Sequence, residues 1–174
     1  MSNSDNYKYY YNDNNELHRE DGPAIIFSDG SKCWYKNNKL HREDGPAIEY
    51  VNGNKHWYLN GKLHREDGPA IEYANEDKEW WFNDKLHRKD GPAVDKLNGA
   101  KEWWVNNLLH REDGPAVEGG NGTKAWLINN EYHRKDGPAI EYTNGDKEWY
   151  YHGKHIKCNS QEEFERLIKL LPFW

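Results

Sequence analysis

The stretch Leu17–Ile25, LHREDGPAI, decides the fold because it returns at a fixed interval along a chain of 174 residues. It recurs almost letter for letter from Leu40 and from Leu63, and successive copies of its histidine lie 23 residues apart. A period of this length predicts a repeat protein, in which stacked copies of one small module bury a shared core. The motif histidines are His18, His41, His64, His87, His110 and His133.

Three further columns keep the same period, which excludes chance. Each repeat carries one tryptophan, with Tyr11 in the register before the first, and each also carries one proline and one lysine. No insertion or deletion interrupts the count between the first tryptophan and the last. The tryptophans are Trp34, Trp57, Trp80, Trp103, Trp126 and Trp149. The lysines are Lys32, Lys55, Lys78, Lys101, Lys124 and Lys147.

Each repeat has the pattern of one β-hairpin. Residues 47–51 and 55–59 are strand-forming runs, and they flank Asn52-Gly53, a dipeptide that favours a tight hairpin turn. A second turn signal, Asn60-Gly61, then separates the hairpin from the next repeat. Hairpins joined at constant spacing are expected to pair edge to edge in an antiparallel meander.

The length of the turn fixes which side chains share a face of the sheet. A two-residue turn at Asn52-Gly53 pairs Ile48 with Trp57 on one face and leaves Ala47 and Tyr58 on the other. A three- or four-residue turn would shift the pairing by one position and exchange the two faces. We expect the two-residue turn.

The C-terminal sequence leaves the repeat pattern and predicts a short helix. Ser160 followed by Glu163 is a capping box, and an apolar stripe of helical spacing starts at Phe164. An array of hairpins exposes an edge at each end, so we expect this helix to cap the last hairpin. The alternative is a helix that enters a groove of a partner, with Phe173 and Trp174 as its anchors.

The predicted architecture is therefore all-β: an elongated antiparallel β-hairpin repeat array, either a single sheet or an open solenoid, with a short C-terminal capping α-helix. Residues 1–8 are expected to be disordered, residues 9–157 to form six to seven repeats of 23 residues, and residues 158–174 to form the capping helix.

Composition limits the classes of partner. The formal net charge is −6, whereas phosphate binding needs a basic face, so nucleic acid is not the expected partner. The two cysteines, Cys33 and Cys158, lie far apart and outside any metal-ligand spacing. No window has the roughly 18 apolar residues of a membrane span. These features predict a cytoplasmic protein without a membrane partner.

The motif combines His, Arg, Glu and Asp but predicts a structural loop rather than a reactive site. Loops of neighbouring repeats would lie about 10 Å apart, too far to share one metal ion easily. A catalytic site needs one distinct environment, whereas this loop occurs six times in similar surroundings. We therefore expect no enzyme activity, no metal and no cofactor. The motif aspartates, expected to close the turns, are Asp21, Asp44, Asp67, Asp90, Asp113 and Asp136.

The repeat resembles the MORN family (membrane occupation and recognition nexus), with "WYLNGKLH" at residues 57–64 as the best-matching stretch. It departs from that pattern in "HREDGP", and is more similar to a divergent set of HRxDGPA repeats from phages, giant viruses and bacteria. The resemblance covers residues 11–157 and implies an extended antiparallel sheet used for binding or scaffolding, in the host cytoplasm if the protein is viral.

Function is expected where the repeats differ. Paired aromatics such as Trp80-Trp81 and Trp103-Trp104 must line both faces of the sheet, and one aromatic face is a candidate protein-binding platform, since Tyr and Trp are favoured at interfaces. The opposing interpretation is that both faces are buried within the chain. The candidate partner-binding residues are Tyr58, Trp81, Trp104, Tyr150, Phe173 and Trp174.

The sequence thus predicts a non-enzymatic protein-binding or scaffold module, which in a viral setting would inhibit a host factor. A homo-oligomer formed through a sheet edge is a further expectation. Two alternatives stay open: capture of a nucleotide or other small molecule in an aromatic groove, and binding of lipid or nucleic acid through the lysine column. Solvated lysines that protect a sheet edge are the simpler explanation of that column.

Overall fold

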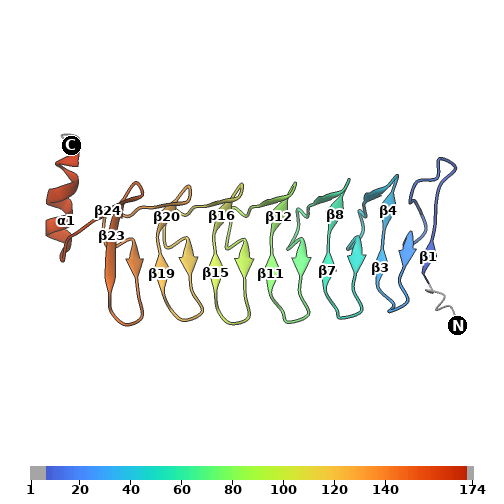
Figure 1. Ribbon diagram of the computed structural model, residues 1–174, viewed down its shortest axis with the longest axis horizontal. Coiled ribbons are helices and arrows are strands. Elements are labelled where there is room, and N and C mark those ends of the chain that lie inside the picture. The colour runs from blue at the N-terminus through green and yellow to red at the C-terminus, as the bar shows by residue number, and fades with distance from the viewer. Residues whose placement is uncertain (1–6, 172–174) are drawn as a thin grey trace, which may run out of the picture. The chain divides into compact units, whose positions relative to one another are not determined.

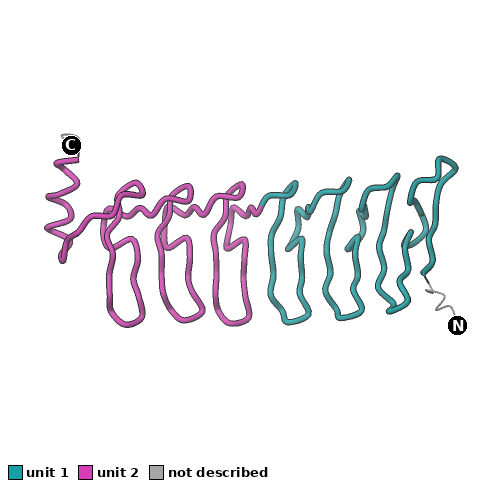
Figure 2. Tube along the Cα trace, viewed as in Figure 1, with its two compact units in different colours: residues 1–85 teal, residues 86–174 magenta. Residues whose placement is uncertain are grey.

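The structure is a computed structural model that describes residues 7–171. The chain divides into two compact units, residues 1–85 and 86–174, and each unit is built from hairpins laid side by side (Figures 1 and 2). The fold is an all-β antiparallel array of hairpins with one short C-terminal helix, as predicted.

The main strands of each unit follow one another in sequence order. In the first unit the order is β1 (Lys8–Tyr9), β2 (Ile25–Ile26), β3 (Lys32–Cys33), β6 (Ile48–Glu49), β7 (Lys55–His56), β10 (Ile71–Glu72) and β11 (Lys78–Glu79). In the second it is β14 (Val94–Asp95), β15 (Lys101–Glu102), β18 (Val117–Glu118), β19 (Lys124–Ala125), β22 (Ile140–Glu141), β23 (Lys147–Tyr151) and β24 (Lys154–Ile156). Pairing in sequence order makes each sheet an antiparallel meander.

The predicted register of the main hairpin is wrong by one residue. Ile48 pairs with His56 and Glu49 with Lys55, so the loop contains three residues, 51–53. The backbone N–H of Gly53 donates to the carbonyl of Tyr50 (3.0 Å), and Gly53 has φ +93°. This is the three-residue loop that ends in a left-handed glycine. The two faces are therefore exchanged, and Trp57 lies on the face opposite Ile48.

Each full repeat contains a second hairpin, which the prediction of one hairpin per repeat missed. Tyr58 pairs with Leu63 and Leu59 with Lys62 around Asn60-Gly61. Both turn residues have positive φ, 53° and 82°, as a type I′ turn requires. The small hairpins are β4 (Tyr35–Lys36) with β5 (Lys39–Leu40), β8 (Tyr58–Leu59) with β9 (Lys62–Leu63), β16 (Trp104–Val105) with β17 (Leu108–Leu109), and β20 (Leu127–Ile128) with β21 (Glu131–Tyr132). Strands β12 (Trp81–Phe82) and β13 (Lys85–Leu86) lie at the boundary of the units.

The first repeat departs from the 23-residue count. Tyr10, not Tyr11, occupies the tryptophan position, because its N–H donates to the carbonyl of Ala24 (2.8 Å) as that of Trp34 does to Ala47 (2.8 Å). The loop at 12–16 is one residue longer than its counterpart at 36–39. Residues 1–8 were expected to be disordered, but Lys8 belongs to β1 and pairs with Ile26 of β2. Residues 1–6 of that segment lie outside the described residues.

The C-terminal helix α1 (Gln161–Ile168) packs on the last hairpin. Ser160 is its N-cap, and its hydroxyl accepts the backbone N–H of Glu163 (3.2 Å). Phe164 is fully buried in a cluster with Trp149 and Ile156. This position agrees with a cap on β24, at the end of the second unit (Figure 1). Within residues 7–171, no helix is both long and apolar enough to cross a membrane.

Candidate functional site

The motif arginine is the centre of each loop between repeats. The guanidinium carbon of Arg65 lies 4.2 Å above the ring of Trp57, which is the geometry of a cation–π contact. Its Nε donates to Asp67 (2.9 Å), and its Nη1 donates to the carbonyl of Pro69 (3.2 Å) and to Glu72 (3.0 Å). Arginine–aromatic stacking recurs at Arg19 on Tyr10, Arg42 on Trp34, Arg111 on Trp103 and Arg134 on Trp126. We call the side of the sheet that carries these stacks the arginine face.

The motif aspartates hold the arginines rather than mainly closing the turns through backbone bonds. The pKa of the Asp67 carboxyl is lowered mainly by the hydrogen bond from Arg65. The hydrogen bond that this carboxyl accepts from the backbone N–H of Asp67 contributes least. The same order, arginine first and backbone last, applies to Asp44 and Asp113. These carboxylates therefore act as arginine partners.

The motif glycine, such as Gly68, is required for space and not for an unusual conformation. Its φ lies outside the left-handed region, but a Cβ at this position would be 2.9 Å from the guanidinium carbon of Arg65. The corresponding distance is 2.7–3.1 Å at Gly22, Gly45, Gly91, Gly114 and Gly137. A side chain here would push the arginine off its tryptophan.

The motif histidines tie each loop to the small hairpin of the next repeat. Nδ1 of His41 accepts the backbone N–H of Asn60 (3.2 Å), and Nε2 faces a Glu43 carboxylate oxygen 3.4 Å away. The same acceptance of a backbone N–H joins His18 to Asn37, His87 to Asn106 and His133 to His152. In His64 and His110, Nδ1 contacts the side-chain oxygen of Asn83 (3.1 Å) and of Asn129 (2.9 Å). Across residues 7–171, no group of three or more His, Cys, Asp or Glu side chains is arranged to hold a metal ion.

Shallow grooves run between consecutive motif loops. One is lined by residues 42–46 and 64–67 with Trp57 and Leu59 beneath them, and the second unit has its equivalent around Trp126. Their rims are the exposed carboxylates of residues such as Glu43 and Glu66. Because the arginines inside are already bonded to carboxylates and carbonyls, these grooves offer few free donors.

The candidate partner-binding residues share one strand position on the opposite side of the sheet. Each of them is the residue immediately after a repeat tryptophan, and each is half-buried. They are Tyr58 and Trp81 in the first unit and Trp104 and Tyr150 in the second. They share this side with Ile48, His56 and their equivalents, and we call it the aromatic face. Phe173 and Trp174 lie outside the described residues.

Glutamates that the sequence prediction did not single out hold the polar ends of these aromatics. The indole N–H of Trp81 donates to Glu79 (2.8 Å), and that of Trp104 donates to Glu102 (2.8 Å). The hydroxyl of Tyr150 donates to Glu148 (2.9 Å). The signal was present as Lys-Glu-Trp at residues 78–80, 101–103 and 147–149, because side chains two positions apart on a strand share a face in either register.

His56 takes the place of this glutamate beside Tyr58. Burial lowers the pKa of His56, so that its neutral form is favoured, and burial also raises the pKa of Tyr58. The ring of His56 lies edge-on to Tyr50, with centroids 5.2 Å apart. This repeat therefore has an uncharged aromatic surface where three later repeats have a carboxylate, Glu79, Glu102 or Glu148.

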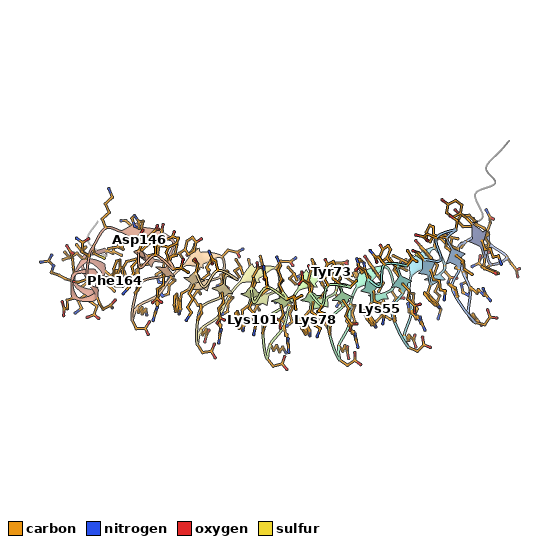
Figure 3. The ribbon with its side chains drawn as sticks, turned by 90° about the horizontal axis from the view of Figure 1, so that it is seen from below. Lys55, Tyr73, Lys78, Lys101, Asp146 and Phe164 are labelled. Atoms are coloured by element: carbon orange, nitrogen blue, oxygen red, sulfur yellow. The ribbon has the colours of Figure 1, made fainter. Side chains whose placement is uncertain are left out.

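The lysine column lies on the arginine face, between glutamates. Lys55 pairs with Glu49 on one side and Glu72 on the other, and Lys78 also pairs with Glu72. Figure 3 shows Lys55 and Lys78 on the side of the sheet away from Tyr73. The row alternates in charge, with the same alternation at Lys101, Glu118, Lys124 and Glu141. Such a row is not a continuous basic stripe.

Comparison with known proteins gives no assignment for this chain. No protein-family model matches the sequence, and no curated protein matches it.

Proposed function

We propose that this protein is a non-enzymatic binding or scaffold module that docks a protein partner on its aromatic face. The observation that carries this proposal is the set of half-exposed aromatic side chains at one repeated position, represented by Tyr58, Trp81, Trp104 and Tyr150. Rigid, partly exposed Tyr and Trp side chains are the residues that contribute most at protein interfaces.

The two faces differ in chemistry, and this difference supports the proposal. On the arginine face, charged side chains are paired with one another: Arg65 with Asp67 and Glu72, and Lys55 between two glutamates. On the aromatic face, hydrogen bonds fix the rings but leave part of each ring exposed. A surface that is both ordered and partly apolar loses little conformational entropy on binding.

The partner that we propose is a host protein, inhibited by docking in the host cytoplasm, as the similarity of the HRxDGPA motif to viral repeats suggests. The alternating charges of the lysine row do not favour the lipid or nucleic-acid alternatives, because Lys55, Lys78 and Lys124 each pair with a glutamate.

The test is retention of a protein from cell lysate on immobilised full-length chain. We expect the Trp81→Ala/Trp104→Ala variant to lose a protein that wild type retains. Lys55→Ala/Lys78→Ala, with both changes on the arginine face, is the matched control and should retain it. Circular dichroism establishes that each variant is folded. Equal retention by all three forms, or stabilisation by a nucleotide in a thermal-shift assay with no retained protein, would overturn the proposal.

A further inference from the structure

Two carboxylates on the aromatic face are each held between two aromatic side chains. In the first unit, Oε1 of Glu79 accepts the hydroxyl of Tyr73 (3.1 Å) and Oε2 accepts the indole N–H of Trp81 (2.8 Å). In the second unit, Oε1 of Glu148 accepts the hydroxyl of Tyr142 (3.1 Å) and Oε2 accepts that of Tyr150 (2.9 Å). The same arrangement is thus built twice, from residues 69 positions apart, which is three repeats.

Among the described residues, neither carboxylate is paired with an arginine of its own unit. The described arginines of the first unit bind other carboxylates, as Arg134 of the second unit binds Glu141. The strand neighbour of Glu79 is Ile71, and nearby His56 is favoured in its neutral form by burial. Each negative charge is therefore available to a ligand.

The tyrosines keep these carboxylates oriented over a wide pH range. Burial, with a further contribution from Glu79, raises the pKa of Tyr73 to about 12, so its hydroxyl stays a hydrogen-bond donor at neutral pH. A carboxylate has about four lone-pair positions and each of these carboxylates uses two for its aromatic partners. The other positions can accept hydrogen bonds from a bound cation.

The arginine face shows what a complete arrangement of this kind contains. There, Trp57 supplies the ring, Glu72 supplies a carboxylate, and Arg65 lies on the ring and donates to the carboxylate. On the aromatic face, Trp81 and Glu79 supply the ring and the carboxylate, whereas the arginines of the first unit bind the aspartates of their own loops. Charge complementarity therefore favours a guanidinium from outside the chain, which both stacks on aromatic faces and binds carboxylates.

We propose that the Tyr73–Glu79–Trp81 and Tyr142–Glu148–Tyr150 clusters each bind an arginine side chain of the docked protein partner. The inference deepens the proposed function and rests on it, because it names the chemistry of the partner: a segment with exposed arginines. Glu102 beside Trp104 lacks the tyrosine, since Lys96 occupies that column, so this repeat is not a third site.

The test uses the folded full-length protein and a defined probe, the peptide N-acetyl-Gly-Arg-Gly-amide. Its control is the citrulline peptide, which keeps the shape of arginine but has no charge. With ¹⁵N-labelled tryptophan, the indole signal of Trp81, assigned from Trp81→Phe, should shift saturably with the arginine peptide and not with the citrulline peptide. Glu79→Gln should weaken this binding about tenfold, a change of about 1.4 kcal/mol. Glu49→Gln, which alters a glutamate already paired with Arg42, should leave it unchanged.

Three results would overturn the proposal: no saturable shift of Trp81, an equal shift with the citrulline peptide, or unchanged binding by Glu79→Gln. Glu79→Asp, which keeps the charge, guards against a folding defect and should bind more tightly than Glu79→Gln. The two proposals fail separately. Loss of a lysate protein in Trp81→Ala/Trp104→Ala together with its retention by the double variant Glu79→Gln/Glu148→Gln would remove the arginine sites alone. Peptide binding without any retained protein would remove the docking function alone.

Discussion

Replacing Gly68 with alanine tests whether the motif glycine exists to make room for the arginine. The added Cβ would lie 2.9 Å from the guanidinium carbon of Arg65 and 3.1 Å from its Nε and Nη2, closer than carbon atoms tolerate. The arginine side chain is flexible and can move aside. The cost of the substitution is therefore the loss of the contacts that Arg65 makes with Trp57, Pro69 and Glu72.

Those contacts set the magnitude. An exposed cation–π contact contributes about 0.5–1 kcal/mol, the hydrogen bond to the Pro69 carbonyl about 0.5–1.5 kcal/mol, and the partly exposed pair with Glu72 about 0–1 kcal/mol. Alanine also stabilises by about 0.4–1 kcal/mol where the native backbone accepts it, because it restricts the unfolded chain. We expect Gly68→Ala to lower the free energy of unfolding by about 1–2 kcal/mol.

A double-mutant cycle isolates the cause. In an Arg65→Met background the new Cβ meets no guanidinium, so Gly68→Ala should become neutral or mildly stabilising. Urea unfolding followed by circular dichroism measures all four proteins, and a slope of about 2 kcal/mol per molar converts the expected loss into a midpoint shift of roughly 0.5–1 M. Independent sites are additive within about 0.3–0.5 kcal/mol. A coupling energy below that limit would refute the steric explanation.

Three further predictions concern the turns, the helix and the response to alkali. Asn106 has φ 52°, so Asn106→Ala should lower the free energy of unfolding by about 1 kcal/mol in urea titrations while Asn106→Gly should not; equal losses would contradict a conformational cause. Phe164→Ala should cost about 3–5 kcal/mol, whereas Leu170→Ala, at a half-exposed position, should cost far less, and similar costs would show that α1 does not cap the hairpin. Burial raises the pKa of Cys33 from 9.0 to about 11 and that of Tyr73 from 10.0 to about 12. Between its unfolded and folded pKa, each group keeps its proton in the native state and has lost it in the unfolded chain. The free energy of unfolding should therefore fall as the pH rises from 9 to 12. Cys33→Ala and Tyr73→Phe should flatten that decline, and an unchanged slope in the double variant would contradict the assignment.

The period, the strands and the helix could be predicted from the sequence, but the register could not, because the dipeptide Asn-Gly forms two different turns in one repeat. Asn52-Gly53 ends a three-residue loop, whereas Asn60-Gly61 is a two-residue type I′ turn. In the first loop the side chain of Asn52 accepts the backbone N–H of Asn54 (3.0 Å), a local bond that stabilises this loop. Contacts more distant in sequence then favour the same register, because it places Lys55 between Glu49 and Glu72.

The glycine of the motif shows a second limit of sequence reasoning. A glycine next to aspartate and proline suggests a conformational role, and at Asn60-Gly61 that reasoning is correct. At Gly68 the requirement comes from a side chain three residues earlier that folds back over the backbone. A spatial requirement of this kind leaves the same signature in the sequence as a positive φ, so only the position of the Arg65 guanidinium distinguishes the two.

The corrected register shows where the repeats vary. On the arginine face, tryptophan, arginine and lysine keep their identity from repeat to repeat, because each of these side chains is a partner in a stack or a charge pair. On the aromatic face, the column Cys33, His56, Glu79, Glu102, Ala125 and Glu148 changes from apolar to acidic, and the column after the tryptophan changes between Tyr, Trp and Leu. Part of this variation belongs to packing within the array, because Cys33, Ala125 and Leu127 are buried in core clusters on this face. The varying positions that stay half-exposed, such as Trp81 and Trp104, are the ones on which the proposed docking surface rests, because a buried side chain cannot contact a partner.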